Sequence, residues 1–240
     1  FAGGKRFRPT LCLAVAEVLG CPSKKVLPFA CAVEMIHTFT LIHDDLPPMD
    51  NSDLRRGKTT CHKEYGEALA ILAGDGLNTL AFKIIANYPK ALSELASALM
   101  VVVEGQVADI QSTKKKMSIK ELVEVHNWKT GALLIACVRG TALICGASPK
   151  KVEALTNYAH HLGLAFQIAD DILDSTSTSE QLGKPAGADI GKGFPFVVGL
   201  DKSKELAAEE MAKAIKAVSI FGKKSSSLIS LAEYVLSRKK

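Results

Sequence analysis

The apolar residues of this chain recur with helical spacing along almost its whole length. The pattern is clearest in 11–19, 67–86 and 154–172, where apolar side chains return every three or four positions. No segment alternates convincingly between apolar and polar residues, as a half-buried strand would. The sequence therefore predicts an all-α fold.

Turn-forming residues interrupt this helical pattern at 20–24, 46–57, 88–89, 113–117, 146–150 and 175–195. These breaks leave about eight or more helices of ordinary length. Ser118 lies three residues before Glu121, which is the spacing of a capping box at the start of a helix that should run toward Val138. Because no solenoid repeat or low-complexity linker is found, we expect one domain over residues 1–240, built as a single large helical bundle.

Composition excludes several classes of protein and partner. Of the 240 residues, 48% are apolar and 23% are charged, the proportions of a folded globular chain. A net charge of +5, scattered basic residues and only 6% aromatic residues argue against nucleic acid as a partner. No unbroken apolar run approaches the roughly 18 residues that cross a bilayer, so we expect no membrane span.

The cysteines show no CxxC spacing, and several lie within apolar helical segments. They are Cys12, Cys21, Cys31, Cys61, Cys137 and Cys145. Cysteines of this kind are typical buried free thiols. The sequence therefore indicates a reducing, cytoplasmic setting.

The first segment that points to chemistry is an acidic cluster directly after an apolar helical segment. Within ten residues it holds Asp44, Asp45, Asp50 and Asp53. Such carboxylates repel one another unless a cation lies among them. Two prolines end the helix after Asp45 and let Asp50 fold back toward Asp44, whereas a continuous helix would place it about 240° away. A solvated acidic turn is the alternative for this segment taken alone.

A second acidic cluster lies in 166–174. Asp170 and Asp174 are four residues apart on one helical face, and Gln167 joins the same stripe. Paired carboxylates in an apolar helix are expensive to bury without a counter-ion. Hard oxygen ligands without a histidine at ligand spacing favour Mg²⁺ over zinc. Two such clusters facing one cavity suggest a polynuclear Mg²⁺ site that shares its coordination shell with a diphosphate.

Basic residues complement the acidic clusters. Lys5 and Arg8 are three residues apart, and Arg55 and Arg56 directly follow the first cluster. Guanidinium groups match the geometry of phosphate oxygens. His37 lies two helical turns before Asp44 on nearly the same face, where it could contact a second anionic group, although a lone helical histidine is more often structural.

At these residues the sequence resembles the trans-isoprenyl diphosphate synthases, and most closely the bacterial farnesyl diphosphate synthases. The resemblance covers essentially all 240 residues. It is carried by Gly4-Lys5-x-x-Arg8-Pro9, Asp44-Asp45-(x)4-Asp50 with Leu54-Arg55-Arg56-Gly57, Cys61-His62-Lys63 through Gly66-Glu67, Leu72-Ala73-Gly74-Asp75, Gly105-Gln106-x-x-Asp109, His126-x-x-Lys129-Thr130, Asp170-Asp171-x-x-Asp174 and Gly183-Lys184.

The resemblance implies a fold of the isoprenoid synthase type, a helical bundle around a central cavity, and it assigns a role to each matching residue. The residues implied to bind three Mg²⁺ ions are Asp44, Asp50 and Asp170, supported by Asp45, Asp171 and Asp174. Those implied to bind the allylic diphosphate or lie near its carbocation are Arg55, Lys129, Thr130, Gln167, Lys184 and Lys192. Those implied to bind isopentenyl diphosphate are Gly4, Lys5, Arg8, His37 and Arg56.

The implied reaction is ionisation of the allylic diphosphate, condensation with isopentenyl diphosphate and loss of a proton. It needs no side-chain nucleophile, in agreement with the absence of a Ser/His/Asp or Cys/His arrangement. The chain-length residues implied by the family are Phe39 and Thr40. Phe39 lies about 7.5 Å behind Asp44 along a helix, where its ring could end the cavity at a C15 product, (E,E)-farnesyl diphosphate, or could be ordinary core.

Several alternatives stay open at this point. A geranylgeranyl (C20) diphosphate synthase shares the chemistry, and a non-catalytic regulatory subunit shares the fold, but all six motif aspartates are present here. A terpene cyclase has no need for Lys5, Arg8 and Arg56. Family resemblance also implies a homodimer, an additional helix before Gly4, and a longer loop than the one at 189–195.

Overall fold

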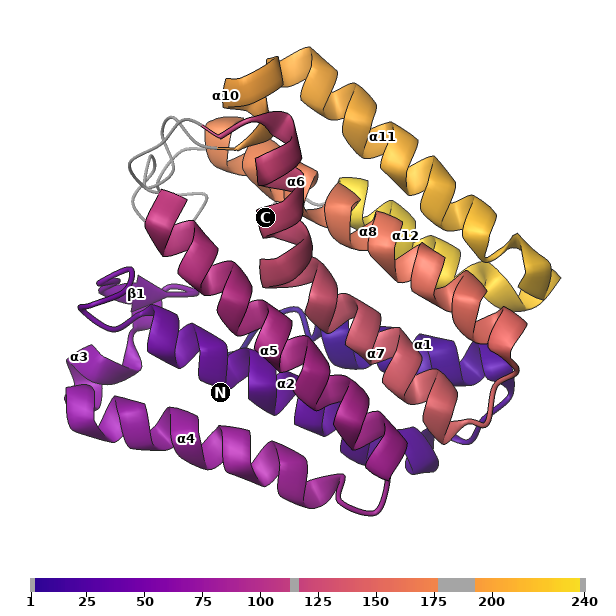
Figure 1. Ribbon diagram of the computed structural model, residues 1–240, viewed down its shortest axis with the longest axis horizontal. Helices are drawn as coiled ribbons and strands as arrows, with labels where there is room; N and C mark the ends of the chain where they lie inside the picture. The colour runs from indigo at the N-terminus through magenta and orange to yellow at the C-terminus, as the bar shows by residue number, and fades with distance from the viewer. Residues whose placement is uncertain (1–2, 113–116, 177–192, 238–240) are drawn as a thin grey trace.

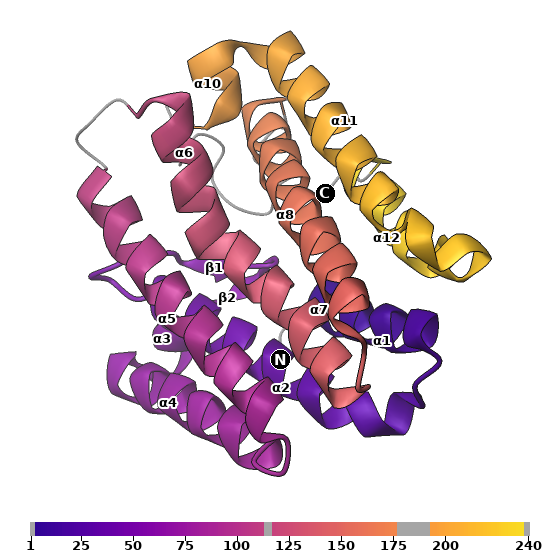
Figure 2. The ribbon, with the colours of Figure 1, turned by 45° about the vertical axis from the view of Figure 1, so that its right-hand side comes forward.

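The computed structural model describes residues 3–112, 117–176 and 193–237, and most of these lie in helices (Figures 1 and 2). The α-helices are α1 (Phe7–Leu19), α2 (Ser23–Asp44), α3 (Cys61–Tyr65), α4 (Glu67–Ile84), α5 (Pro89–Ser112), α6 (Ile119–His126), α7 (Ala132–Ile144), α8 (Pro149–Thr176), α10 (Phe194–Val198), α11 (Leu200–Ala217) and α12 (Ser226–Ser237). A π-helical turn, η1 (Asn127–Gly131), joins α6 to α7, and a 3₁₀ segment, η2 (Ser219–Ser225), precedes α12. The all-α prediction is confirmed.

The helices form two groups joined through α1 and α7. On one side α2 packs against α4, and α5 packs against α7. On the other side α8 packs against α11 and α12 (Figure 1). Because α1 contacts α2, α7 and α12, and α7 contacts α8, these two helices connect the sides.

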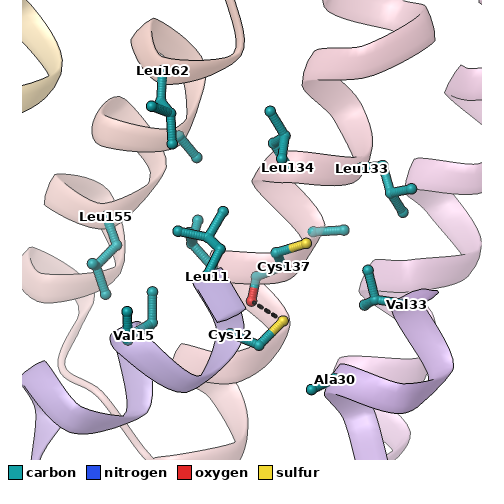
Figure 3. Close-up of a cluster of buried hydrophobic side chains, with 14 of the residues drawn as sticks. Leu11, Cys12, Val15, Ala30, Val33, Leu133, Leu134, Cys137, Leu155 and Leu162 are labelled. Atoms are coloured by element: carbon teal, nitrogen blue, oxygen red, sulfur yellow. Dashed lines mark hydrogen bonds between the residues drawn. The ribbon is translucent and has the colours of Figure 1, made fainter. Parts of the chain in front are cut away.

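The main hydrophobic core fills the space where α1, α2, α7 and α8 meet. Figure 3 shows side chains from these four helices directed toward one another. The fully buried ones include Leu11, Val15, Val33, Leu155 and Leu162. A smaller cluster, formed by α6, α8, α10 and α11, contains Leu122, Leu164, Ile168, Phe194 and Ala207. Burial of these apolar surfaces is the main force that holds the helices together.

All six cysteines are free thiols, as predicted, but their burial differs from the prediction. Cys12 and Cys137 lie in the core, where the Cys12 thiol donates to the Cys137 carbonyl oxygen at 3.6 Å (Figure 3). Cys31 is exposed, and the other three are partly buried. The expectation of burial was wrong for Cys31 because it lies on the outer face of α2, between the buried Ala30 and Ala32.

Most helix boundaries fall at the predicted breaks. Gly20 ends α1 with a left-handed φ of 70°, a conformation that glycine adopts without strain. The capping box is confirmed, since Ser118 Oγ accepts from the Glu121 N–H at 3.3 Å and Glu121 Oε2 accepts from the Ser118 N–H at 2.8 Å. The helix expected to run toward Val138 is instead divided by the π-helical turn at 127–131.

A short antiparallel hairpin was not predicted. Strands β1 (Leu54–Arg55) and β2 (Lys58–Thr59) pair with Leu54 opposite Thr59. Both turn residues, Arg56 and Gly57, have positive φ angles of 57° and 74°, as in the tight hairpin turns that match strand twist. Strands of two residues are too short to show an alternating pattern, so apolar periodicity did not predict them.

Two helices are long and apolar enough to cross a membrane by length and composition alone. They are Ser23–Asp44 and Pro89–Gln111, each with a mean hydropathy of 1.4. In the most apolar windows of these helices, 39% and 28% of residues are buried. Core helices of soluble proteins pass the same test, so the absence of a membrane span stays a prediction.

The close approach of α7 to α2 predicts the effect of one substitution. A side chain at Gly140 would overlap the ring of Phe29, which is fully buried. We expect Gly140→Ala to destabilise the protein by about 1–3 kcal/mol, the usual result of overpacking a core. Gly76→Ala in α4 is the matched control, because nothing lies within 4 Å of its added Cβ. The free energy of unfolding of each variant can be measured by urea titration. Equal values for Gly140→Ala and Gly76→Ala would contradict this account.

Candidate active site

The first acidic cluster begins where α2 ends. Asp44 is the last residue of α2, and the backbone N–H of Asp50 donates to the Asp44 carbonyl oxygen at 2.9 Å. The intervening turn, which contains Pro47 and Pro48, thus brings Asp50 back onto the helix end. The predicted return of Asp50 to Asp44 is confirmed at the backbone.

Asp44 is an acid in a partly desolvated position. Burial, followed by the neighbouring charges of Asp50 and Asp45, raises its pKa to about 6, while Lys129 and Arg55 oppose the shift. Ionisation of Asp44 is therefore less favourable than that of an ordinary aspartate. A cation placed beside Asp44 and Asp50 would favour the ionised form.

Asp45 faces a different partner. Its side chain is 4% exposed, and one carboxylate oxygen, Oδ1, accepts from Arg55 Nη2 at 2.5 Å and from Arg55 Nε at 2.9 Å. The hairpin that carries Arg55 is thus fixed to the end of α2. This ion pair brings one of the residues expected to bind the allylic diphosphate next to the first acidic cluster.

The hairpin also brings Arg56 to the N-terminal segment. Arg56 Nη1 donates to the carbonyl oxygen of Gly3. A side chain at Gly4 would overlap the Arg56 guanidinium, so glycine is required for this approach. Two residues expected to bind isopentenyl diphosphate, 52 positions apart in the sequence, therefore lie in contact. Lys5, between Gly4 and Arg6, is exposed.

His37 lies near several arginines, and we use the name cationic cluster for His37 with Arg6, Arg8, Arg55 and Arg56. Burial, together with the four guanidinium groups, lowers the pKa of His37 to about 2. Of these arginines, Arg6 pairs with Glu34 at 2.9 Å. His37 is therefore neutral at physiological pH, within a field that favours an anion.

Arg8 adds a specific sign of a missing partner. Its Nε is buried and has no hydrogen-bond partner among the described residues. Burial lowers the pKa of Arg8, whereas Cys137, Glu34 and Asp170 oppose the shift. An unpaired buried donor is costly, and an anionic ligand would satisfy it.

Lys129 lies in the π-helical turn and faces the first acidic cluster. Burial alone would lower its pKa, but Asp109, followed by Asp44 and Asp50, raises it overall. Its Nζ donates to Asp109 Oδ2 at 2.7 Å. The turn packs tightly on α5, because a Cβ added at Gly105 would lie 2.7 Å from the backbone nitrogen of Lys129. Thr130, the next residue, is buried.

Asp109 is a site residue to which sequence reasoning gave no role. The only signal was its place in the Gly105-Gln106-x-x-Asp109 motif. In the structure it holds the ammonium group of Lys129. Asp109, on α5, thus holds the Lys129 ammonium group near the carboxylates of Asp44 and Asp50.

The second acidic cluster lies in the last two turns of α8. Asp170 is close enough to Arg8 to influence its pKa, which links this cluster to the N-terminal basic residues. Asp171 and Gln167 both bond to His126, at 3.2 Å and 3.1 Å. Asp174 is partly buried one turn further along α8. Lys184 and Lys192, and most of the short loop at 189–195, lie outside the described residues.

The described residues do not form a closed metal site by themselves. Within 3–112, 117–176 and 193–237, no group of three or more His, Cys, Asp or Glu side chains is arranged to hold a metal ion. The carboxylates near Asp44 are nevertheless the hard oxygen donors that Mg²⁺ prefers. Mg²⁺ commonly completes its shell with waters and substrate phosphates, so an open set of donors is compatible with it.

Phe39 lies one helical turn before His43 on the face of α2 that meets α4. Their ring centroids are 4.9 Å apart in an edge-to-face arrangement. His43 Nε2 lies 3.1 Å from the Ile71 carbonyl oxygen, and a side chain at Gly74 would overlap the His43 ring. Phe39 is partly buried against the main core, so both its proposed roles stay open. The Thr40 hydroxyl donates to the His37 carbonyl oxygen at 2.9 Å.

A surface pocket of about 620 Å³ lies elsewhere, between α1, the start of α2 and α12. Its lining includes Thr10, Glu17, Ser23, Ser227 and Leu231 and none of the predicted site residues. The central cavity therefore stays a prediction.

The sequence of this chain is similar to those of prenyl synthases. The polyprenyl synthetase family model matches residues 1–229. The farnesyl diphosphate synthase of Geobacillus stearothermophilus is 46% identical over 222 residues, which cover 86% of this chain and 75% of its own. The chloroplastic geranylgeranyl pyrophosphate synthase of Capsicum annuum is 46% identical over 253 residues, covering 99% and 69% of the two chains.

Solved structures agree with the sequence relatives. A polyprenyl synthase from Caulobacter crescentus CB15, in complex with calcium and isoprenyl diphosphate, matches with a TM-score of 0.93 at 33% identity. The match covers 100% of this chain and 86% of that one. The fold is thus the isoprenoid synthase fold that the family resemblance implied. This chain belongs to the polyprenyl synthetase family and is a trans-prenyl synthase.

Proposed function

We propose that this prenyltransferase condenses isopentenyl diphosphate with dimethylallyl or geranyl diphosphate to give (E,E)-farnesyl diphosphate, with Mg²⁺ as cofactor. The observation that carries the proposal is the separation of charge in the site. The carboxylates of Asp44 and Asp50 lie close enough to Lys129 to influence its pKa, while the cationic cluster around His37 holds an unpaired buried donor of Arg8. The carboxylates suit metal ions that bind one diphosphate. The cationic cluster suits a second diphosphate.

The proposed metal ligands are Asp44, Asp50 and Asp170, for three Mg²⁺ ions. The raised pKa of Asp44 and its carboxylate neighbours support a cation there. The similar polyprenyl synthase of Caulobacter crescentus CB15 is complexed with calcium and isoprenyl diphosphate, which supports a divalent ion here. When bound, Mg²⁺ would supply Lewis-acid neutralisation of the departing diphosphate.

The chain's own groups would act on the two substrates separately. Lys129, held by Asp109, would bind the allylic diphosphate together with Arg55. Arg8, Arg56 and His37 would bind isopentenyl diphosphate, and this ligand would satisfy Arg8 Nε. Thr130 and Gln167 would lie near the allylic cation, and the apolar helices would exclude water from it. The proton would leave with the released diphosphate, so no side-chain base is required.

A C20 product is the second candidate. It is favoured by relatives named as geranylgeranyl pyrophosphate synthases, such as that of Capsicum annuum. The C15 product is supported by the ring of Phe39 one turn behind the end of α2 and by the farnesyl diphosphate synthase of Geobacillus stearothermophilus. Product length is therefore the property that separates the two.

We further propose a homodimer. The faces of α4 and α5 expose apolar side chains at helical spacing, including Leu69, Leu72, Leu80, Met100, Val103 and Val107. Both helices contact α2, and an apolar surface of this kind is typical of a protein interface. A second copy of this chain is the proposed occupant. A cytoplasmic location is also proposed, supported by the six free thiols.

Incubation of the purified protein with isopentenyl and geranyl diphosphates should test the proposed reaction directly. We expect a C15 alcohol by gas chromatography after phosphatase treatment, with Mg²⁺ present and not after chelation by EDTA. Asp44→Asn should reduce the rate by at least about 100-fold, because it removes a carboxylate that stabilises the transition state through the metal. A C20 product would support the second candidate, and no product would favour the regulatory subunit.

Phe39→Ala tests whether this ring sets the product length. Removing the ring opens space behind Asp44, so we expect C20 to replace C15 as the main product in the same assay. Phe221→Ala is the matched control, since Phe221 is also partly buried against the main core but lies in η2. An unchanged product profile for Phe39→Ala would show that Phe39 is ordinary core.

A further inference from the structure

His126 links three segments of the site, and the mechanism above gives it no part. It is the last residue of α6, and its Nδ1 lies 3.1 Å from Gln167 Nε2 on α8. Its other ring nitrogen, Nε2, lies 3.2 Å from Asp171 Oδ2. Its ring stacks on Phe194 with centroids 5.7 Å apart and an interplanar angle of 14°.

These hydrogen bonds determine the position of the ring proton. The amide nitrogen of Gln167 lies 3.1 Å from His126 Nδ1 and can only donate, so Nδ1 is the acceptor. The ring proton is then on Nε2, which donates to Asp171 Oδ2. The carbonyl oxygen of Gln167 is the end of the amide that points away from this bond.

Asp171, which fixes the histidine, is itself held by the backbone at the start of α10. Its Oδ2 also accepts from the Phe194 N–H at 2.9 Å. Gly193 has a φ of 86°, and a Cβ there would lie 2.7 Å from the same oxygen. The side chains of His126 and Asp171 are only 13% and 15% exposed. The backbone, Asp171, His126 and Gln167 thus form one continuous chain of hydrogen bonds.

We propose that His126 is a positioning residue that directs the carbonyl oxygen of Gln167, rather than its amide nitrogen, toward the positive charge on the allylic substrate. This inference rests on the proposed prenyl transfer. A carbonyl oxygen carries partial negative charge and stabilises a developing cation, whereas the NH₂ end would oppose it. Because this charge develops only during the reaction, the loss of His126 should lower kcat more than it changes KM.

The first test compares kcat and KM for the allylic diphosphate. His126→Phe keeps the ring that stacks on Phe194 and removes both hydrogen bonds. We expect kcat to fall about 10- to 100-fold, as for other groups that orient a catalytic side chain, with KM changed by less than about 3-fold. His126→Gln retains a donor and an acceptor and should recover part of kcat. His160→Phe, a control away from the site on α8, should match the wild type.

The second test asks whether His126 acts through Gln167. In a Gln167→Leu background, His126→Phe should lower kcat by less than about 3-fold, because residues that act as a unit are not additive. If His126→Phe lowered kcat in that background as much as it does in the wild type, the proposal would be overturned. An unchanged kcat in the single His126→Phe variant, or a rise in KM alone, would also overturn it.

A third measurement needs no turnover. Nitrogen-15 NMR of the substrate-free protein should show the ring proton of His126 on Nε2 and none on Nδ1, as its two hydrogen bonds require. A proton on Nδ1 would contradict the proposed arrangement. If the wild-type protein makes no prenyl product, the proposed function fails, whereas this spectrum still decides the orientation of His126. The two failures are therefore distinguishable.

Discussion

The site depends on unlike charges placed in partly desolvated positions within a helical bundle. Asp44 and Asp50 meet at the end of α2, while the arginines of the cationic cluster lie near a neutral His37. Charges of one sign so close together destabilise the folded protein unless a ligand neutralises them. Diphosphates and divalent cations together would neutralise both parts. The free protein thus carries an electrostatic strain that its substrates are proposed to relieve.

Backbone features hold these charges in place. The turn after α2 returns Asp50 to Asp44, and the hairpin turn at Arg56 and Gly57 places Arg55 on Asp45 and Arg56 on the N-terminal segment. On the other side of the site, the π-helical turn carries Lys129 to Asp109. A π-helical turn within an α-helix is frequently found at a functional site. Irregular backbone therefore lies where the proposed chemistry occurs, and regular helices supply the rigid frame.

The sequence predicted what depends on local pattern. Helical periodicity, the Ser118 capping box and the return of Asp50 follow from residues a few positions apart, and all three are confirmed. Two other features depend on contacts across the fold. Asp109 meets Lys129 across 20 positions and His126 meets Asp171 across 45, so a single sequence shows no sign of either pairing. The hairpin was missed because its strands are too short for a periodic signal. Product length depends on cavity shape, which spacing along one helix does not determine.

Titration of His37 by NMR, with and without inorganic pyrophosphate, tests the central electrostatic claim most directly. In the free protein, His37 should remain neutral down to about pH 5, well below the ordinary histidine pKa of about 6.5, because burial and four guanidinium groups oppose its protonation. Pyrophosphate should raise the pKa of His37, since an anion bound at the cationic cluster offsets the arginine charges. Ordinary titration near pH 6.5 in the free protein, or no response to pyrophosphate, would contradict the account.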